Sequence, residues 1–243
     1  MANFMDEQFL RVIQEQERKE REEAKEEQLS IPKVTAAVLS GLLKLGSEEI
    51  TFSETEVIPG QVSLRMPESF VEMPEQFAAM KYPSDRRPKL IYTDESLSIN
   101  INVNPTDNRM YDDEMEKFQS EMLAMLKRMQ PNARWLSDGV FTLGQAGRVE
   151  VEQAASEQEG QLHQKEAVQA SATDGKRVGY YEFLSPAMDG NIYNLTFFME
   201  WEEKGLFFSV NCMEKQMKLW RPIAHGIMAS LRIIGSSPNE GEG

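Results

Sequence analysis

The sequence predicts an α+β fold, in which a central antiparallel β-sheet is flanked by helices on both faces as an α/β/α sandwich, with a helical extension at the N-terminus. Residues 180–212 hold three apolar, aromatic runs, separated by turn residues at 189–191 and 202–205. Such runs are typical of an antiparallel meander. Both faces of these runs carry apolar side chains and therefore need a cover. Residues 112–129 and 220–231 have the apolar period of helices that could provide it.

Composition and charge narrow the class of protein. The chain has 243 residues, of which 40% are hydrophobic, and a net charge of -14. An acidic chain lacks the basic face that a phosphate backbone needs, so we expect no nucleic-acid partner. The acidity is otherwise a solubility feature, although a basic partner would also fit it.

The number of cysteines and the lengths of the apolar runs indicate the cellular compartment of the protein. The single cysteine, Cys212, excludes an internal disulfide and falls in an apolar run, which is typical of a buried thiol. The N-terminus has no signal-peptide pattern, and no window approaches the roughly 20 apolar residues of a membrane span. We therefore expect a cytoplasmic protein.

Residues 1–30 form a charged N-terminal segment, with a predicted helix over 5–28. Its apolar stripe ends after Ile13, and the remainder is almost entirely Glu, Gln, Lys and Arg. The segment is either a solvated extension or a short docking and self-association helix that presents Phe9 and Ile13. A long coiled coil is disfavoured because apolar heptad positions are not sustained.

Residues 31–47 are interpreted as an apolar connecting segment between this arm and the main domain. Helical spacing favours a helix that ends at Gly46, although the run could also pair as a strand. Its lack of charge makes it a candidate second interface. The main domain is predicted over 48–234, and the Ser, Pro, Gly and Glu composition of 235–243 predicts a disordered tail.

Alternation predicts several strands at the front of the domain. In the last of these strands, Leu97, Ile99, Ile101 and Val103 are expected to face the core, while Ser98, Asn100 and Asn102 face water. The predicted strands are 50–57, 62–66, 90–93 and 97–103.

The helix predicted at 112–129 carries a methionine-rich stripe from Met115 to Met129, interpreted as a cover for the sheet or, alternatively, as an adaptable binding surface. Two strands follow within 134–153, and 156–174 is a polar hairpin tip or loop. Pro222 is tolerated best in a first turn, so the last helix is expected to begin near Arg221.

Several phrases carry a resemblance to a known family. They are RMPESF, MKYPSDRRPKLIYTDESLSININ, DGNIYNLTFFMEW, GLFFSVNC and LWRPIAHGIMASLRI. Over 48–234 the chain resembles a bacterial family of the PsbP-like fold, which is shared by PsbP, Mog and DcrB proteins and by the effector-associated chaperones of type VI secretion. The resemblance implies a sheet sandwiched by helices, no enzymatic activity and binding of other proteins, with the chaperones holding client helices on the sheet. The chain differs from the DcrB pattern in two features, its added residues before position 48 and its lack of an export signal. These features argue against a DcrB-like role in the envelope.

No motif for chemistry is present in the sequence. The histidines, His163 and His225, have no metal-ligand spacing, and no nucleophile elbow, phosphate-binding loop or dinucleotide motif occurs. We therefore expect no catalytic residue, no metal, no cofactor and no enzyme.

Two hypotheses of function follow. The first is a non-catalytic protein-interaction module, such as an adaptor or chaperone for a protein client in the bacterial cytoplasm. Its candidate contacts are Phe9 and Ile13 on the arm and Phe197, Met199 and Phe208 on the sheet. The arm could also join two copies of the chain as a homodimer. The alternative is a domain that binds a small ligand or a metal in a pocket between sheet and helix.

Overall fold

The large sheet forms the centre of the molecule. The computed structural model describes residues 15, 18, 27–84, 87–144 and 175–234. The sheet is antiparallel, with the strand order β4-β5-β6-β10-β9-β8-β7. Its strands are β4 (Val71–Glu72), β5 (Leu90–Thr93), β6 (Asn100–Arg109), β7 (Arg134–Thr142), β8 (Arg177–Ala187), β9 (Gly190–Trp201) and β10 (Lys204–Met213). The predicted meander is therefore confirmed as β8, β9 and β10.

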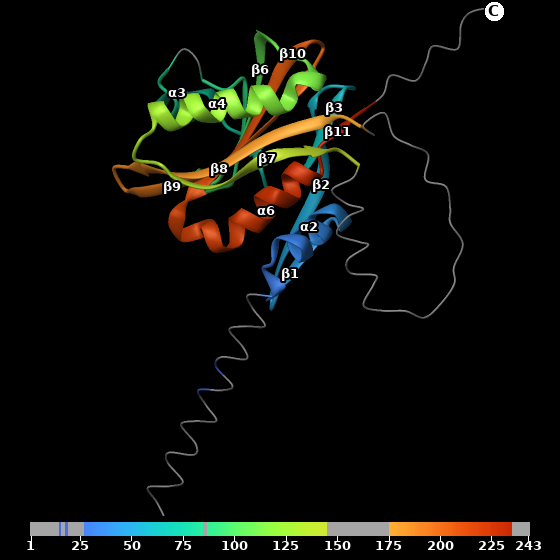
Figure 1. Cartoon of the computed structure of the whole chain (residues 1–243). Helices are drawn as coiled ribbons and strands as arrows, with labels where there is room; N and C mark the ends of the chain where they lie inside the picture. The colour runs from blue at the N-terminus through green and yellow to red at the C-terminus, as the bar shows by residue number, and fades with distance from the viewer. Residues whose placement is uncertain (1–14, 16–17, 19–26, 85–86, 145–174, 235–243) are drawn as a thin grey trace, which may run out of the picture.

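A smaller antiparallel sheet of four strands lies beside the large one. Its order is β1-β2-β3-β11. The strands are β1 (Leu42–Leu45), β2 (Glu48–Ile58), β3 (Val62–Pro67) and β11 (Arg232–Ile233). Because β11 follows the last helix and pairs with β3, the small sheet combines strands from the N-terminal and C-terminal parts of the described domain (Figure 1).

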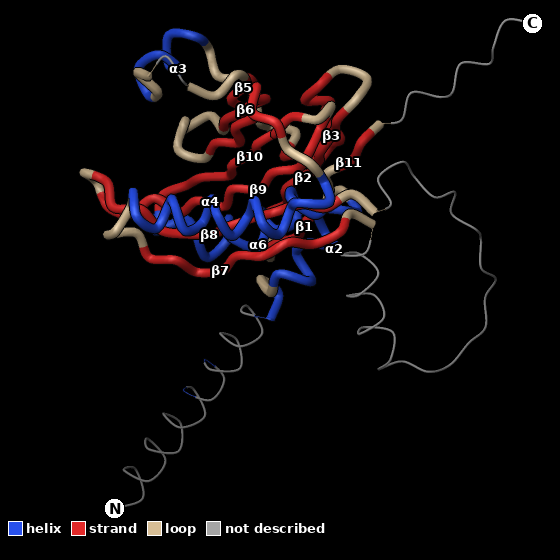
Figure 2. The backbone as a smooth tube through the Cα atoms, turned by 45° about the horizontal axis from the view of Figure 1, so that its top comes forward, coloured by secondary structure: helices blue, strands red, loops and turns tan. Residues whose placement is uncertain are grey.

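Helices cover the two faces of the large sheet, as the sequence predicts. On one face α4 crosses β7 and β8, and on the other α6 packs on β9 and β10 (Figures 1 and 2). Figure 2 also shows α3 standing apart from α4, beside β5. The helices are α2 (Ile31–Ser40), α3 (Glu75–Lys81), α4 (Met115–Met129) and α6 (Met217–Ala229), with short 3-10 turns at Asp112–Glu114 and Glu214–Gln216.

Residues 31–47 belong to the domain, which corrects their interpretation as a connecting segment. They form helix α2 and strand β1, divided at Gly41, whose φ of 93° is readily adopted only by glycine. Val34 and Val38 are fully buried in the main core. The run was ambiguous between helix and strand because it contains one of each.

Helices α2 and α6 touch through a glycine. A Cβ at Gly226 would lie 2.7 Å from Cγ2 of Val38, so only glycine permits this approach without a shift. Helix α6 begins before Arg221, so Pro222 lies inside it and not in its first turn. A proline there removes one helical hydrogen bond, and its buried ring adds to the apolar face of the helix.

Two apolar cores lie on opposite faces of the sheet. On the α6 face, Phe197 and Phe208 stack with ring centroids 4.8 Å apart. On the α4 face, Phe198 is buried with Met115 and Tyr181. Each aromatic side chain that leaves water contributes roughly 1.5–3 kcal/mol, so both helices are held by burial. Met125 and Met129 are exposed, which limits the core role expected for the methionine stripe to the other side of α4.

The turn between β9 and β10 differs in detail from the prediction. Its positive φ angles fall on Glu202 and Glu203, at 53° and 61°. Gly205 instead lies in β10 at a register shift, where an added Cβ would come within 2.8 Å of the Phe207 ring. The glycine that suggested a turn therefore serves packing.

Several predictions fall outside the described residues. They are the helix at 5–28, apart from residues 15, 18, 27 and 28, the second strand of 134–153, the loop at 156–174 and the tail at 235–243.

Candidate functional site

The residues predicted to bind a partner on the sheet are core residues. Phe197 and Met199 are 0% exposed and Phe208 is 1% exposed, all on the face that α6 covers. The assignment of these three residues as contacts is wrong, because a side chain buried in this way cannot reach a partner. Phe9 and Ile13 lie outside the described residues.

Polar side chains are buried on each face of the sheet, and the first group surrounds Glu182 of β8. Its Oε1 accepts hydrogen bonds from the Tyr193 hydroxyl at 2.6 Å and Arg221 Nε at 2.8 Å. Its Oε2 accepts from the Ser137 hydroxyl at 2.7 Å and Arg221 Nη2 at 3.0 Å. His225 Nε2 lies 3.3 Å from Oε1. We call these five residues the Glu182 cluster.

The Glu182 cluster holds a charge in the interior. Burial by itself raises the pKa of Glu182, but hydrogen bonds from His225, Arg221, Tyr193 and Ser137 outweigh it, and the pKa falls well below its ordinary value. Burial and the neighbouring Glu182 charge raise the pKa of Tyr193. Both carboxylate oxygens are fully used, so the cluster ties α6 to β7, β8 and β9 and offers no open position to a substrate.

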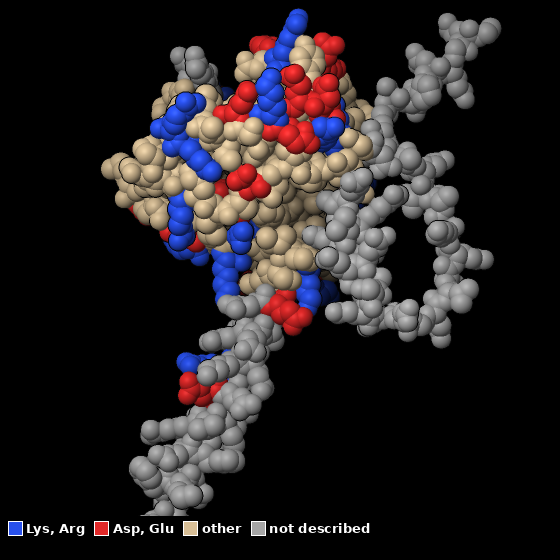
Figure 3. Space-filling model, viewed as in Figure 1, with Lys and Arg blue, Asp and Glu red and all other residues tan. Residues whose placement is uncertain are grey.

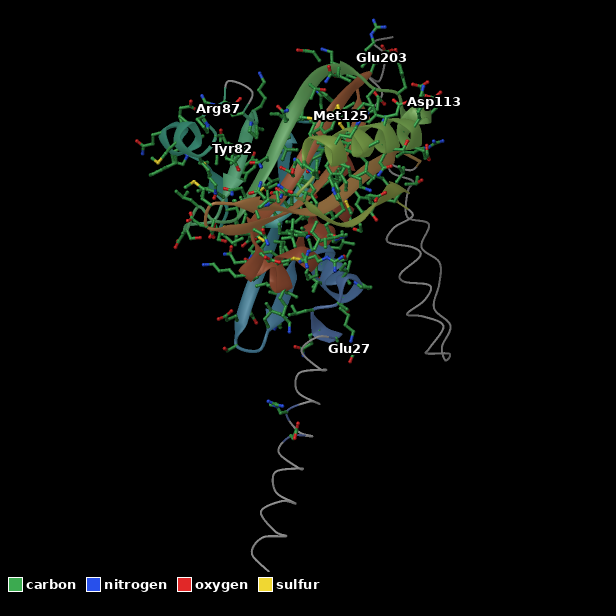
Figure 4. The ribbon with its side chains drawn as sticks, turned by 60° about the vertical axis from the view of Figure 1, so that its left-hand side comes forward. Glu27, Tyr82, Arg87, Asp113, Met125 and Glu203 are labelled. Carbon is green, nitrogen blue, oxygen red and sulfur yellow. The ribbon has the colours of Figure 1, made fainter. Side chains whose placement is uncertain are left out.

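The second polar group lies on the α4 face, in a hollow of about 320 Å³. Here α4 packs mainly on β7 and β8, and its Phe118 reaches the Phe207 ring of β10, with ring centroids 6.3 Å apart. The hollow itself lies over β6 and β10, which supply most of its lining. Figure 4 shows these strands between Tyr82 and Arg87 on one side and Met125 of α4 on the other. We call the hollow the carboxamide groove. It is lined by Pro88, Asn102, Asn104, Thr106, Asn108, Thr196, Phe207, Phe208 and Ser209.

Strand register places the polar residues side by side. Asn102 pairs with Ser209 of β10, which pairs in turn with Thr196 of β9. One step along, Asn100 pairs with Asn211. Farther across the same face, β8 carries Tyr181 and Phe183, which lie under α4. The face is therefore polar along β6 and aromatic on β8, where α4 packs.

Two buried carboxamides of β6, of which only Asn102 lines the groove, are partly satisfied. Asn100 is 0% exposed and Asn102 is 5% exposed. Their Nδ2 groups donate to Asn211 Oδ1 and Ser209 Oγ, both at 3.0 Å. Their Oδ1 atoms have no hydrogen-bond partner among the described residues.

Tyr82, which follows α3, lies beside Asn102 of the carboxamide groove. Its hydroxyl lies against Asn102 and Asn211. Burial raises the pKa of Tyr82, and hydrogen bonds from these two carboxamides lower it by less. The phenol stays neutral at physiological pH, so the groove holds neutral hydrogen-bonding groups with Phe207 and Pro88 as apolar neighbours.

Charged side chains gather elsewhere on the molecule. In the view of Figure 3 they concentrate over the N-terminal end of α4 and the tips of β6 and β10. Arg177 pairs with Glu116 at 2.7 Å there, and Lys204 pairs with Asp107 at 3.0 Å. Among the described residues, no group of three or more His, Cys, Asp or Glu side chains could hold a metal ion.

The single cysteine, Cys212, is buried. Burial raises the pKa of the Cys212 thiol to about 12, so it is a core thiol and not a nucleophile.

Within the ranges that the structure describes, no helix is long and apolar enough to cross a membrane.

The sequence reasoning missed the carboxamide groove. Asn100 and Asn102 were expected to face water, and this expectation is wrong because β5, β10 and Tyr82 enclose them. Alternation of apolar and polar residues shows that the two faces of a strand differ. It cannot show whether other parts of the chain cover the polar face. The available signal was asparagine itself, which is depleted in strands yet recurs at positions 100, 102, 104 and 108 of β6.

Comparisons with known proteins give a likeness in fold. No family model matches the chain, and no curated protein matches it in sequence. Several solved structures are similar to it, including three bacterial proteins. Cyanobacterial PsbP (CyanoP) from Synechocystis sp. PCC 6803 has a TM-score of 0.46 at 8% identity, over 78% of this chain and 96% of that one.

The other two similar structures come from other bacteria. LpqN, involved in cell envelope biogenesis of Mycobacterium tuberculosis, has a TM-score of 0.41 at 12% identity, over 76% of this chain and 91% of that one. PA94 from Pseudomonas aeruginosa, a protein of unknown function and putative regulator, has a TM-score of 0.36 at 7% identity, over 77% and 99%. A PsbP protein is thus among the matches, in line with the resemblance in sequence. At these scores the likeness concerns the fold alone and carries no argument about function.

Proposed function

We propose that this protein is a non-catalytic protein-interaction module, an adaptor or chaperone, which holds a segment of a protein partner in the carboxamide groove. The observation that carries the proposal is the buried Oδ1 atom of Asn102, which lines the groove and has no hydrogen-bond partner among the described residues. Leaving such an acceptor unpaired costs roughly 1–3 kcal/mol. A partner that supplies N–H or O–H donors recovers this energy when it binds.

The Glu182 cluster gives the contrast that supports this choice. This chain satisfies a buried carboxylate completely, with Arg221 bonded to both of its oxygens. An unsatisfied pair on the opposite face is therefore not a general property of the fold. Native proteins leave few such groups, and each calls for an explanation such as a bound ligand.

A photo-crosslinking experiment tests the proposal in the source cell. A crosslinking amino acid at Asn108, on the exposed rim of the groove, should label one protein. The matched control carries the same group at Met188, which is exposed in the turn between β8 and β9. The labelling should disappear when Asn102→Leu is combined with the Asn108 crosslinker. Labelling that persists in the double variant, or that is equal from both positions, would refute the groove as the binding surface.

The N-terminal arm is a second proposed contact, through Phe9 and Ile13, either to the same partner or to a second copy of this chain. Changing both residues to Ala in the full chain tests it. A dimer by light scattering that becomes a monomer in this variant would make the arm an assembly element. An unchanged mass and an unchanged partner affinity would remove the arm from the proposal. A truncation at Glu48 is unsuitable because it deletes α2 and β1 from the core.

A cytoplasmic location remains part of the proposal. The buried thiol of Cys212 is compatible with it, and fractionation of source cells is the direct measurement. Recovery of the protein with membranes or the envelope would contradict this location.

A small-ligand function is the alternative, and one hollow favours it. About 170 Å³ lies between α2, α6 and the edge of the large sheet, lined in part by Tyr180, His225 and Phe141. A thermal-shift screen of metabolites and calcium tests it, since a ligand that binds only the folded state raises its apparent stability. A shift that His225→Leu abolishes and Asn102→Leu leaves intact would favour this hollow over the groove.

A further inference from the structure

We infer that the carboxamide groove recognises the main chain of an extended, uncharged peptide segment that lies along β6. The inference rests on the function proposed above and names the chemistry of the partner. It starts from the spacing of the polar residues in β6. Asn102, Asn104, Thr106 and Asn108 line the groove at every second position of one strand.

The spacing of this row matches an extended peptide. Successive residues of a strand rise about 3.4 Å, so side chains on one face repeat about every 6.8 Å. An extended segment presents main-chain groups toward the same side with that repeat. A segment that runs along β6 can therefore meet each side chain of the row in the same register, which a compact or branched ligand cannot do.

The hydrogen-bonding groups also match. A carboxamide offers one acceptor oxygen and two N–H donors, which are the groups that a peptide unit itself carries. Among the described residues, none donates a hydrogen bond to Asn102 Oδ1. Main-chain N–H groups are donors that every residue except proline supplies, so binding of this kind depends little on the sequence of the segment.

Strand pairing excludes the simpler mode in which a peptide adds to a sheet edge. β6 is hydrogen-bonded to β5 on one side and to β10 on the other. Its own main chain is therefore occupied, and only its side chains are available to a segment lying on the face. This is the role that the carboxamide row can fill.

The depth of the groove and the charge of its lining restrict which peptide segments can bind. The row is buried at Asn102, half-buried at Asn104 and exposed at Asn108, so the groove deepens toward Asn102. Among the residues that the structure describes, no charged side chain lines it. Burying a charge there without a partner would be costly, so uncharged segments are preferred. The half-buried Phe207 ring gives apolar side chains of the segment a contact.

The test uses the full chain and a named probe. An array of decapeptides with random order, built from Ala, Leu, Phe, Ser, Thr, Asn and Gln, is screened for binding. The strongest hits are then made in three forms: unmodified, scrambled, and N-methylated at alternate residues in each of the two registers. N-methylation removes main-chain N–H donors and keeps the side chains.

The expected pattern follows from recognition of the main chain. Scrambling should change Kd by less than about threefold. N-methylation should weaken binding by at least about tenfold in one register and much less in the other, since a lost hydrogen bond contributes about that factor. Asn102→Leu should weaken binding by a similar factor, and the exposed Asn132→Leu is the matched control that should not. If Asn102→Leu does not fold, as judged by circular dichroism, Asn104→Leu at the half-buried position replaces it.

Three results would overturn the inference. The first is an absence of hits that depend on Asn102. The second is equal binding of both N-methylated forms and the unmodified peptide. The third is perturbation of the Asn102 and Asn104 side-chain NMR signals by neutral maltotriose or cellotriose but not by peptides. If the second result occurs while the Asn108 crosslink persists, the groove binds its partner through side chains, and the proposed function stands without this inference.

Discussion

The two faces of the large sheet treat buried polar groups differently. On the α6 face, Glu182 is fully buried and both of its oxygens are bonded to Arg221 and to further donors. On the α4 face, Asn100 and Asn102 are buried as deeply, but each leaves its Oδ1 unpartnered among the described residues. The comparison teaches that burial alone does not mark a site. The marker is burial with hydrogen-bonding capacity left over.

The largest expected effect is on the satisfied face. Glu182→Ala should lower the free energy of unfolding by about 3–5 kcal/mol. The change leaves the hydroxyl groups of Tyr193 and Ser137 without their acceptor and creates a cavity. Denaturant titration measures it. The control is Glu116→Ala, which removes an exposed ion pair with Arg177 and should cost about 0–1 kcal/mol. A loss below about 1 kcal/mol for Glu182→Ala would mean that the cluster contributes little to stability.

The second prediction concerns pH. The folded-state pKa of Glu182 is lowered from its ordinary value of 4.5, so its contribution to stability is present above that pH and is lost as pH falls toward the folded pKa. The difference in stability between wild type and Glu182→Gln should therefore shrink progressively below about pH 4.5. Unfolding titrations of both proteins from pH 7 to pH 3 measure it. A difference that stays constant with pH would show that folding does not lower the pKa of Glu182.

A smaller effect is expected where α2 meets α6. Gly226→Ala should destabilise the fold by about 1–3 kcal/mol, because the new methyl group meets Val38. The double variant with Val38→Ala should recover part of this loss, with a coupling of at least about 0.5 kcal/mol. Thermal unfolding of the full chain is the measurement. Additive effects would mean that α2 does not pack against Gly226.

The smallest effect is expected at the groove. Asn102→Leu combined with Ser209→Ala should change the free energy of unfolding by no more than about 1 kcal/mol, and could raise it, because an unsatisfied pair is replaced by apolar groups. Denaturant titration of this variant beside Glu182→Ala sharpens the comparison between the faces. A loss as large as that for Glu182→Ala would mean that the carboxamides are structural and would weaken the proposed function.

The fold was largely predictable, and the candidate site was not. Alternating apolar residues and turn residues predicted β8, β9 and β10. Apolar residues that recur three or four positions apart predicted α4 and α6. The groove was missed because Asn102 follows the same alternation as a solvent-exposed residue. Glu182 was missed because one carboxylate among 40 acidic residues carries no local signal of its partners.

What the sequence by itself determined is the set of elements and the class of fold. Strand and helix periods arise between residues a few positions apart, and they are present in the sequence whatever the chain packs against. Only the tertiary structure decided which faces are covered. It put Val34 and Val38 in the core, enclosed Phe197 and Phe208 under α6, and joined Arg221 to Glu182. Burial and hydrogen-bond satisfaction depend on partners far away in the chain, and local pattern does not contain them.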